Sequence, residues 1–236
     1  MPKPLTENHR DLGHPAYGLP EREKSDDLRS AFRAPMAPND GKRKSFSAKD
    51  VIYHEGEQID KVYLIRSGLV KQLNYLSNGR ARIVRLHPSG HWLGLEGLLG
   101  QSYRHTTIAV DKVESEYFSI LSLRRLFRDD PDTFSQLLCQ WHQDLAQADR
   151  WIAGFSTGGI KARLARLLEY LAELEYGQSA DKVSLLSVHD MAEILGVTSE
   201  SVSRILAGFK RCDLLQKQVS PIYQLDIQML HQEARK

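Results

Sequence analysis

Apolar residues recur along the chain with two different periods, and the change between them divides the sequence. Between Phe46 and about Ile120 they form short runs with a period near two, broken by turn residues, which predicts β-strands. The expected strands cover residues 51–53, 62–65, 69–75, 83–86, 106–110 and 116–120. Between two of them lies Asn78-Gly79, a pair that favours a two-residue hairpin. Many short strands at such intervals predict a small antiparallel β-barrel or β-roll.

Beyond residue 129 the period becomes helical. Apolar residues are spaced 4, 3, 4, 3, 4 and 3 apart, which is the a/d pattern of a coiled coil over three heptads. We therefore expect residues 129–157 to form a helix that pairs with its copy in a second chain. The residues expected in this dimer interface are Phe134, Leu138, Trp141, Leu145, Ala148, Ile152 and Phe155. A helix packed only on its own domain is the alternative that the pattern leaves open.

The last third of the chain has the pattern of a helix-turn-helix. A helix expected over residues 161–176 precedes the stretch LLSVHDMAEILGVTSESVSRILAGFK, residues 185–210. In this stretch Ser187 and Thr198 can cap two short helices, and Gly196 can supply the turn between them. Two strand-like runs, residues 214–218 and 222–225, follow as a wing. An ordinary helical hairpin with a solvated face is the alternative.

The second short helix carries side chains suited to reading DNA. Arg204 can bond bidentately to guanine, Glu200 can accept from the amine of cytosine, and Ser203 can reach a base or the backbone. These three residues are the predicted base-reading set. The predicted contacts to the DNA backbone are Thr198, Ser199, Ser201, Lys210, Arg211 and Lys217, which would position the protein without specifying sequence.

Composition limits the other function classes. The 236 residues carry a formal net charge of only +2, so any basic surface must be local. The sequence has no apolar run of 18 residues, no glycine-rich phosphate loop, no Gly-x-Ser-x-Gly elbow and no cluster of metal-ligand residues. We therefore expect a cytoplasmic protein without membrane attachment, and neither an enzyme nor a holder of metal or cofactor. The proline-rich segment 1–45 is expected to be a mobile tail with a short helix near residues 25–32.

Three stretches together resemble the CRP/FNR superfamily of bacterial transcription regulators, over about residues 46–230. They are the helix-turn-helix, the segment VIYHEGEQIDKVYLIRSGLVKQL and the segment KARLARLLEYLAEL. The resemblance implies an α+β fold with a sensory β-roll like the cyclic-nucleotide-binding jelly roll (46–128) and a dimerisation helix (129–157). A winged helix-turn-helix (158–236) would complete it. The implied partners are double-stranded DNA, RNA polymerase and a second copy of the chain.

Within that superfamily the predicted base-reading set resembles the FNR type. FNR-type members use a Glu-x-x-Ser-Arg set, which here corresponds to Glu200, Ser203 and Arg204. The cyclic-AMP receptor type has arginine before the glutamate and glycine before the later arginine, where this chain has Ser199 and Ser203. The resemblance therefore implies a palindrome of TTGAT-like half-sites.

The signal that such a regulator would sense is left open by the sequence. Cyclic-AMP-binding members carry a Gly-Glu-Leu motif and a later Arg-Ser pair. At the corresponding positions this chain reads Gly94-Leu95-Glu96-Gly97 and His105-Thr106. Glu96 and Arg104 lie one position away, and a one-residue slip in a strand turns a side chain to the opposite face. The candidate effector-pocket residues are Glu96, Arg104, His105 and Thr106.

The sequence lacks the ligands for two further ways of sensing, an iron–sulfur cluster and haem. The chain has no cysteine before Cys139, so the four-thiolate iron–sulfur cluster of FNR cannot form within one chain. The cysteine and histidine ligands of haem-containing members fall on Gly94 and Glu96. Because it lacks both the ligand motif and the cluster cysteines, the chain resembles the FixK-type branch, whose members can bind DNA without an effector. Gating by a cyclic nucleotide or haem is the alternative. Cys212 follows two cations, which favour thiolate oxidation, and is the candidate redox residue.

Overall fold

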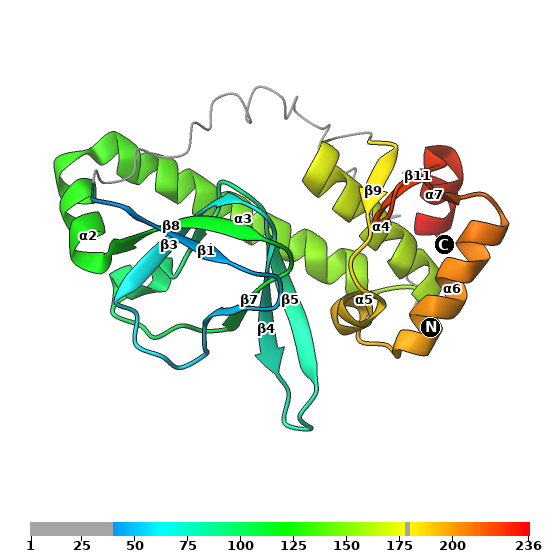
Figure 1. Ribbon diagram of the computed structural model, residues 1–236, viewed down its shortest axis with the longest axis horizontal. Helices are drawn as coiled ribbons and strands as arrows, with labels where there is room; N and C mark the ends of the chain where they lie inside the picture. Colours follow the sequence, from blue (N-terminus) through cyan, green and yellow to red (C-terminus); the bar gives the residue numbers. More distant parts are fainter. Residues whose placement is uncertain (1–39, 178–179) are drawn as a thin grey trace, which may run out of the picture. The chain divides into compact units, whose positions relative to one another are not determined.

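The computed structural model describes residues 40–177 and 180–236, which belong to one compact unit. Most of the predicted tail, including the short helix expected near residues 25–32, lies outside the described residues. Strand β1, Lys42–Phe46, begins inside the segment that the sequence predicts as tail. Figure 1 shows the order of the elements along the chain.

Two four-stranded antiparallel sheets form the β-roll. One has the order β1-β8-β3-β6 and the other the order β2-β7-β4-β5. The bounds are β2 Val51–Tyr53, β3 Lys61–Ser67, β4 Val70–Tyr75, β5 Ala81–His87, β6 Trp92–Leu93, β7 Thr106–Ala109 and β8 Val113–Ser119. The two sheets share one apolar core, which includes Val62 and Leu64 from one sheet and Val70 and Ala109 from the other. The predicted roll is confirmed.

The hairpin between β4 and β5 differs from the two-residue turn that the sequence predicts. Two backbone bonds, Leu76 N–H to Arg80 O at 2.9 Å and Gly79 N–H to Leu76 O at 2.9 Å, close a three-residue loop. Gly79 has a φ of 77°, while Asn78 has no positive φ. Asn78 instead accepts a bond from the Arg80 amide through its Oδ1. An asparagine that bonds to the backbone two residues on stabilises this longer turn.

Helices follow the roll. The 3-10 helix η1, Leu95–Leu99, lies between β6 and β7, and α2, Ile120–Asp129, follows β8. The sequence pattern predicts neither helix. The long helix expected over residues 129–157 is α3, Pro131–Ser156. Its start is built by the Asp130 carboxylate, which accepts from the amides of Asp132 and Thr133, and by a proline at the first helical position.

The C-terminal part combines helices with a three-stranded sheet. The helices are α4 Ile160–Tyr176, α5 Val188–Leu195, α6 Ser199–Arg211 and α7 Ile227–Ala234. The sheet has the order β10-β11-β9, with β9 Lys182–Ser184, β10 Leu215–Lys217 and β11 Ile222–Leu225. The predicted wing is therefore extended by a third strand, β9. Its apolar core also includes Leu73, Ile83 and Leu86 of the roll.

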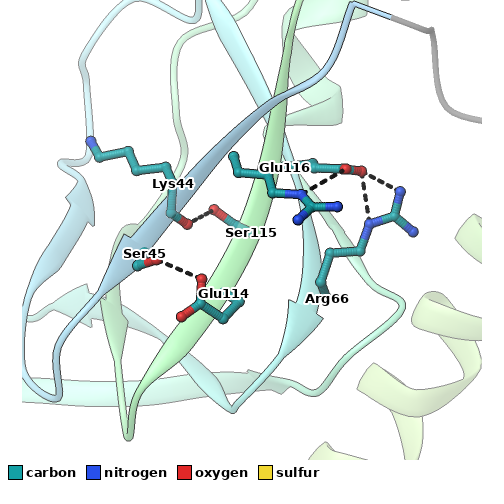
Figure 2. A network of polar contacts seen from close by, with 7 residues as sticks. Lys44, Ser45, Arg66, Glu114, Ser115 and Glu116 are labelled. Carbon is teal, nitrogen blue, oxygen red and sulfur yellow. Dashed lines mark hydrogen bonds and ion pairs between the residues drawn. The ribbon is translucent and has the colours of Figure 1, made fainter.

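Polar contacts join strands β1, β8 and β3 of the roll (Figure 2). Arg66 on β3 donates to the Glu116 carboxylate of β8 at 2.8 Å from Nε, and the Ser115 hydroxyl donates to the Lys44 carbonyl at 2.9 Å. Edge strand β1 presents Lys42, Arg43 and Lys44 to solvent. Charged residues on an edge strand oppose pairing with another sheet, so this edge of the roll is protected.

Candidate nucleic-acid interface

Helix α5 and the turn after it are set by a cap and a glycine. The Ser187 side chain accepts from the Asp190 amide at 3.0 Å and so begins α5. Gly196 ends it with a φ of 64°. This positive φ favours glycine. The Arg82 guanidinium lies in the space that a β-carbon at Gly196 would occupy, so Arg82 packs directly against the turn.

Helix α6 is held by its apolar face. The Thr198 hydroxyl accepts from the Ser201 amide at 3.3 Å and caps the helix. Val202, Leu206 and Phe209 are then buried one turn apart. Ala192 of α5 is also buried, and its small side chain permits close packing of two helices. The predicted caps, glycine turn and apolar face are all present.

The opposite face of α6 is free. Glu200, Ser203 and Arg204 are exposed. Glu200 and Arg204 are four residues apart on one face, yet no ion pair joins them in the described part of the chain. Both charged groups are therefore open to an external partner. Glu200 lies in the first helical turn, the end that reaches base edges when such a helix enters the major groove.

The predicted DNA-backbone residues fall into two groups. Thr198, Ser199 and Ser201 gather at the start of α6, where the Thr198 and Ser201 hydroxyls bond to each other at 2.9 Å. Exposed Arg211 lies at the helix end, and exposed Lys217 lies on wing strand β10. Lys210 differs, because its ammonium lies 4.8 Å from the centre of the Tyr223 ring and 3.3 Å from the Tyr223 hydroxyl. Lys210 is therefore already engaged with wing strand β11.

The predicted dimer residues of α3 lie on two different faces. Leu138, Leu145 and Ile152 are 46%, 60% and 62% exposed and form a stripe at seven-residue spacing, with Phe134 also exposed. Trp141 packs against the core of the roll. Ala148 is half-buried, and Phe155 is buried with α4 at 5% exposed. Sequence spacing cannot separate these faces, because residues at a and d positions lie close together around a helix.

A cavity of about 230 Å³ lies between the roll and α3. Glu96, Arg104 and His105, three of the four predicted pocket residues, line it. Thr106 is not among the lining residues, and its hydroxyl accepts from the Glu55 amide at 3.2 Å. The lining residues that the sequence did not identify are Gln72, Arg85, His87, Trp92, Leu93, Gly94, Leu95, Leu99, Gln101, Trp141 and Asp144. They come from separate elements, so no local sequence signal groups them.

Two side chains that line the cavity hold ring nitrogens without partners. Among the described residues, neither the indole Nε1 of buried Trp92 nor Nδ1 of buried His87 has a hydrogen-bond partner. Nε2 of His87 lies 3.1 Å from the acceptor Oε1 of Gln72 and so carries the proton of the neutral ring, which leaves Nδ1 as an acceptor. Burial, together with the charges of His91 and Arg85, holds the pKa of His87 well below its usual range. Burial raises the pKa of Asp144, opposed by the nearby His91. Unpaired buried polar atoms are unfavourable, so a ligand that accepts from Trp92 and donates to His87 would stabilise the site.

The remaining candidate features are the cysteines, metal sites and membrane-spanning helices. Cys139 and Cys212 are both exposed free thiols, and the Cys212 thiol lies 3.5 Å from the Phe209 carbonyl. Within residues 40–177 and 180–236, no group of three histidine, cysteine or acidic side chains is arranged to hold a metal ion. In the same part of the chain, none of the helices has the length and apolarity needed to cross a membrane.

Comparison with known families divides the chain at the same places. Residues 43–130 match the model of the cyclic nucleotide-binding domain, and residues 162–233 match the model of the Crp-like helix-turn-helix domain. The two matches together span more than half of the chain. They correspond to the β-roll and to the part that contains α5, α6 and the wing.

Individual relatives are similar over most of their length. The transcriptional regulator LdrP of Thermus thermophilus is 27% identical over 194 residues, covering 81% of this chain and 96% of that protein. The nitrogen fixation regulation protein FixK of Rhizobium meliloti is 26% identical, covering 70% and 73%. Among solved structures, FixK2 of Bradyrhizobium japonicum has a TM-score of 0.72 at 25% identity, covering 81% of this chain and 96% of its own. LdrP is thus named as a transcriptional regulator and FixK as a regulation protein.

Proposed function

The chain belongs to the CRP/FNR superfamily of transcription regulators, and from that premise we propose that it is a homodimer that reads a palindromic DNA site. Each half-site would be TTGAT-like. The observation that carries the proposal is the free face of α6, where Glu200, Ser203 and Arg204 are exposed and unpaired with one another. These are the side chains that can bond to cytosine, to a base or phosphate, and to guanine.

The second copy would bind along α3. We define the free stripe as Leu138, Leu145 and Ile152, which are exposed at seven-residue spacing. Such a stripe on a 26-residue helix supports pairing with the same helix of another chain. A two-fold dimer would present two α6 helices about one DNA turn apart, roughly 34 Å. Promoter-bound dimers would then contact RNA polymerase.

DNA binding is proposed to need no small-molecule effector. The resemblance places buried Leu95 where cyclic-AMP-binding members have the glutamate of their Gly-Glu-Leu motif, which binds the ribose. The chain also has only two cysteines, too few for a four-thiolate cluster. FixK and FixK2 are among its relatives. Control would then come from protein abundance, or from oxidation of Cys212, whose exposed thiol lies just beyond α6.

Binding to a TTGAT–N4–ATCAA duplex tests the proposal. Purified protein would be titrated at fixed salt onto this duplex and a scrambled duplex, with and without cyclic AMP and before and after mild oxidation. Tight binding to the palindrome alone, without ligand, is the expected result. Equal affinity for both duplexes would contradict the proposed site.

A second candidate function is gating by a small ligand in the cavity between the roll and α3. The donor of Trp92 and the acceptor of His87, both without partners in the described part of the chain, favour it. On this alternative, specific binding in the same experiment would appear only after a ligand is added. A ligand at 100 times its dissociation constant would also add about 2.7 kcal/mol to the free energy of unfolding.

A further inference from the structure

The β4–β5 hairpin is attached to the helix-turn-helix at its base. The Lys71 ammonium of β4 pairs with the Asp190 carboxylate of α5, with side chains 14% and 12% exposed. Leu73 and Ile83 belong to the same apolar cluster as Leu195. These contacts come from both strands of the hairpin, so the hairpin and α5 are held together.

The tip of this hairpin therefore lies beside the start of α6. We call residues 76–82 the hairpin tip. It lines one side of a groove of about 560 Å³, and α5 with the turn and cap that follow it lines the other. The residues on that second side include His189, Glu193, Gly196, Thr198 and Ser199. A helix-turn-helix inserts the start of its second helix into the major groove, so the hairpin tip lies next to the expected path of the DNA backbone.

The charge of the hairpin tip suits that position. Arg80 is exposed, and neither Arg80 nor Arg82 takes part in an ion pair in the described part of the chain. By contrast, Arg66 on strand β3 pairs with Glu116 of strand β8 (Figure 2). Across the groove, Glu193 pairs with His189 at 3.2 Å between Oε1 and Nε2. The hairpin tip thus contributes net positive charge to the edge of the DNA-reading surface.

We propose that the hairpin tip is an additional DNA-backbone contact, in which Arg80 binds a phosphate flanking the bases read by α6. The inference rests on the proposed function and extends it, because it gives the β-roll a direct part in binding DNA. Two observations select DNA as the occupant: the unpaired positive charge, and the continuity of this surface with the start of α6. Guanidinium groups bind phosphate oxygens well, and such contacts add affinity without adding sequence preference.

The test compares Arg80→Ala with Arg43→Ala. Arg43 is the control because its side chain is 90% exposed on strand β1, where it forms only a long ion pair with Glu116, 3.9 Å between nitrogen and oxygen. The Arg43→Ala change removes the same charge from the same roll. Affinities for the palindromic and scrambled duplexes would be measured by titration at several salt concentrations, with thermal unfolding recorded for each variant. Arg80→Ala should weaken binding to both duplexes about three- to tenfold and reduce the slope of log K against log salt by about 0.9 for each contacting copy. Arg43→Ala should change neither quantity.

A modified duplex locates the contact. If Arg80 binds flanking phosphates, a palindrome with uncharged methylphosphonate links on both flanks should abolish the difference between wild type and Arg80→Ala. The inference would be overturned if Arg80→Ala kept the affinity and the salt slope of the wild type. The proposed function would remain intact as long as the wild-type protein still selected the palindrome. Unchanged DNA binding with reduced transcription in vitro would also overturn the inference, because the hairpin tip would then contact a protein. Absence of specific binding by the wild-type chain would overturn both.

Discussion

Lys71 of strand β4 and Asp190 of helix α5, 119 residues apart in the chain, form an ion pair from which most solvent is excluded. The Asp190 carboxylate also accepts from the Ser187 hydroxyl at 2.8 Å, and Ser187 is the residue that begins α5. One carboxylate therefore bonds both to the cap of the first helix of the helix-turn-helix and to a strand of the roll.

Removal of one member of this pair should destabilise the protein strongly. Lys71→Met leaves the Asp190 carboxylate buried without its cation, which typically lowers the free energy of unfolding by about 3–5 kcal/mol. The double variant Lys71→Met/Asp190→Asn keeps the serine hydrogen bond and has no unpaired charge, so it should recover most of that loss. Urea unfolding of the wild type and the variants measures both effects. A loss below about 0.5 kcal/mol in Lys71→Met would show that the pair is solvated.

Base specificity should depend on Arg204 and not on Lys217. Arg204→Ala should lose about 1–3 kcal/mol of binding free energy for the palindrome and relax the preference at one base pair. Lys217→Ala, on the exposed wing strand, should weaken all duplexes alike and lower the salt dependence. Titration against a set of single-base-pair variants of the palindrome separates the two. If Arg204→Ala kept the full preference at every position, the recognition face would have to lie elsewhere.

Self-association should depend on the free stripe of α3. Leu145→Asp places a charge on a side chain that is 60% exposed in the single chain and that would be buried between two copies. Each buried leucine stabilises by about 1.5–3 kcal/mol, so the dimer should dissociate and affinity for the palindrome should fall. Sedimentation equilibrium measures the association constant. Leu121→Asp is the control, because Leu121 is 64% exposed on helix α2; equal dimerisation of both variants would argue against the stripe.

The free energy of unfolding should decrease at acid pH because of His87. In the folded chain its pKa is lowered by burial and by neighbouring His91 and Arg85, whereas an unfolded histidine titrates near pH 6.5. The unfolded state therefore binds the proton more readily, and the free energy of unfolding should fall as the pH drops below about 6.5, by at most about 1.4 kcal/mol per pH unit. Asp144, whose pKa is raised by burial, acts with the opposite sign. The difference between wild type and His87→Gln, measured by urea unfolding from pH 7.5 to 5, isolates the histidine; parallel curves would contradict this account.

Local signals predicted most of the fold. Ser187, Gly196 and Thr198 perform the capping and turn roles that their types and spacing predict, because those roles involve only neighbouring backbone atoms. Strand alternation likewise predicted the roll. Helix α7 and strand β9 were not predicted, since they are short segments whose order depends on packing against distant elements. The hairpin turn was assigned one residue too short because Asn-Gly also suits a longer loop.

The site was predicted only as far as it is local. The base-reading set lies within one helix, and helical spacing brings it onto one face. Partners from other elements were not identified: the stacking of Lys210 on Tyr223, the packing of Trp141 on the roll, and the unpaired ring nitrogens of Trp92 and His87 beside the cavity. No sequence period links residues that meet only after the chain has folded.

The place of the Arg82 guanidinium against Gly196 limits how far the two halves of this protein can be exchanged between family members. A chimaera that joins its C-terminal part to another roll would lose the arginine that covers the turn and the lysine that neutralises Asp190. The graft would keep its recognition residues but also a buried, uncompensated carboxylate. Exchange of DNA specificity should therefore succeed by replacing side chains on the free face of α6, and fail when the whole domain is transplanted without strands β4 and β5.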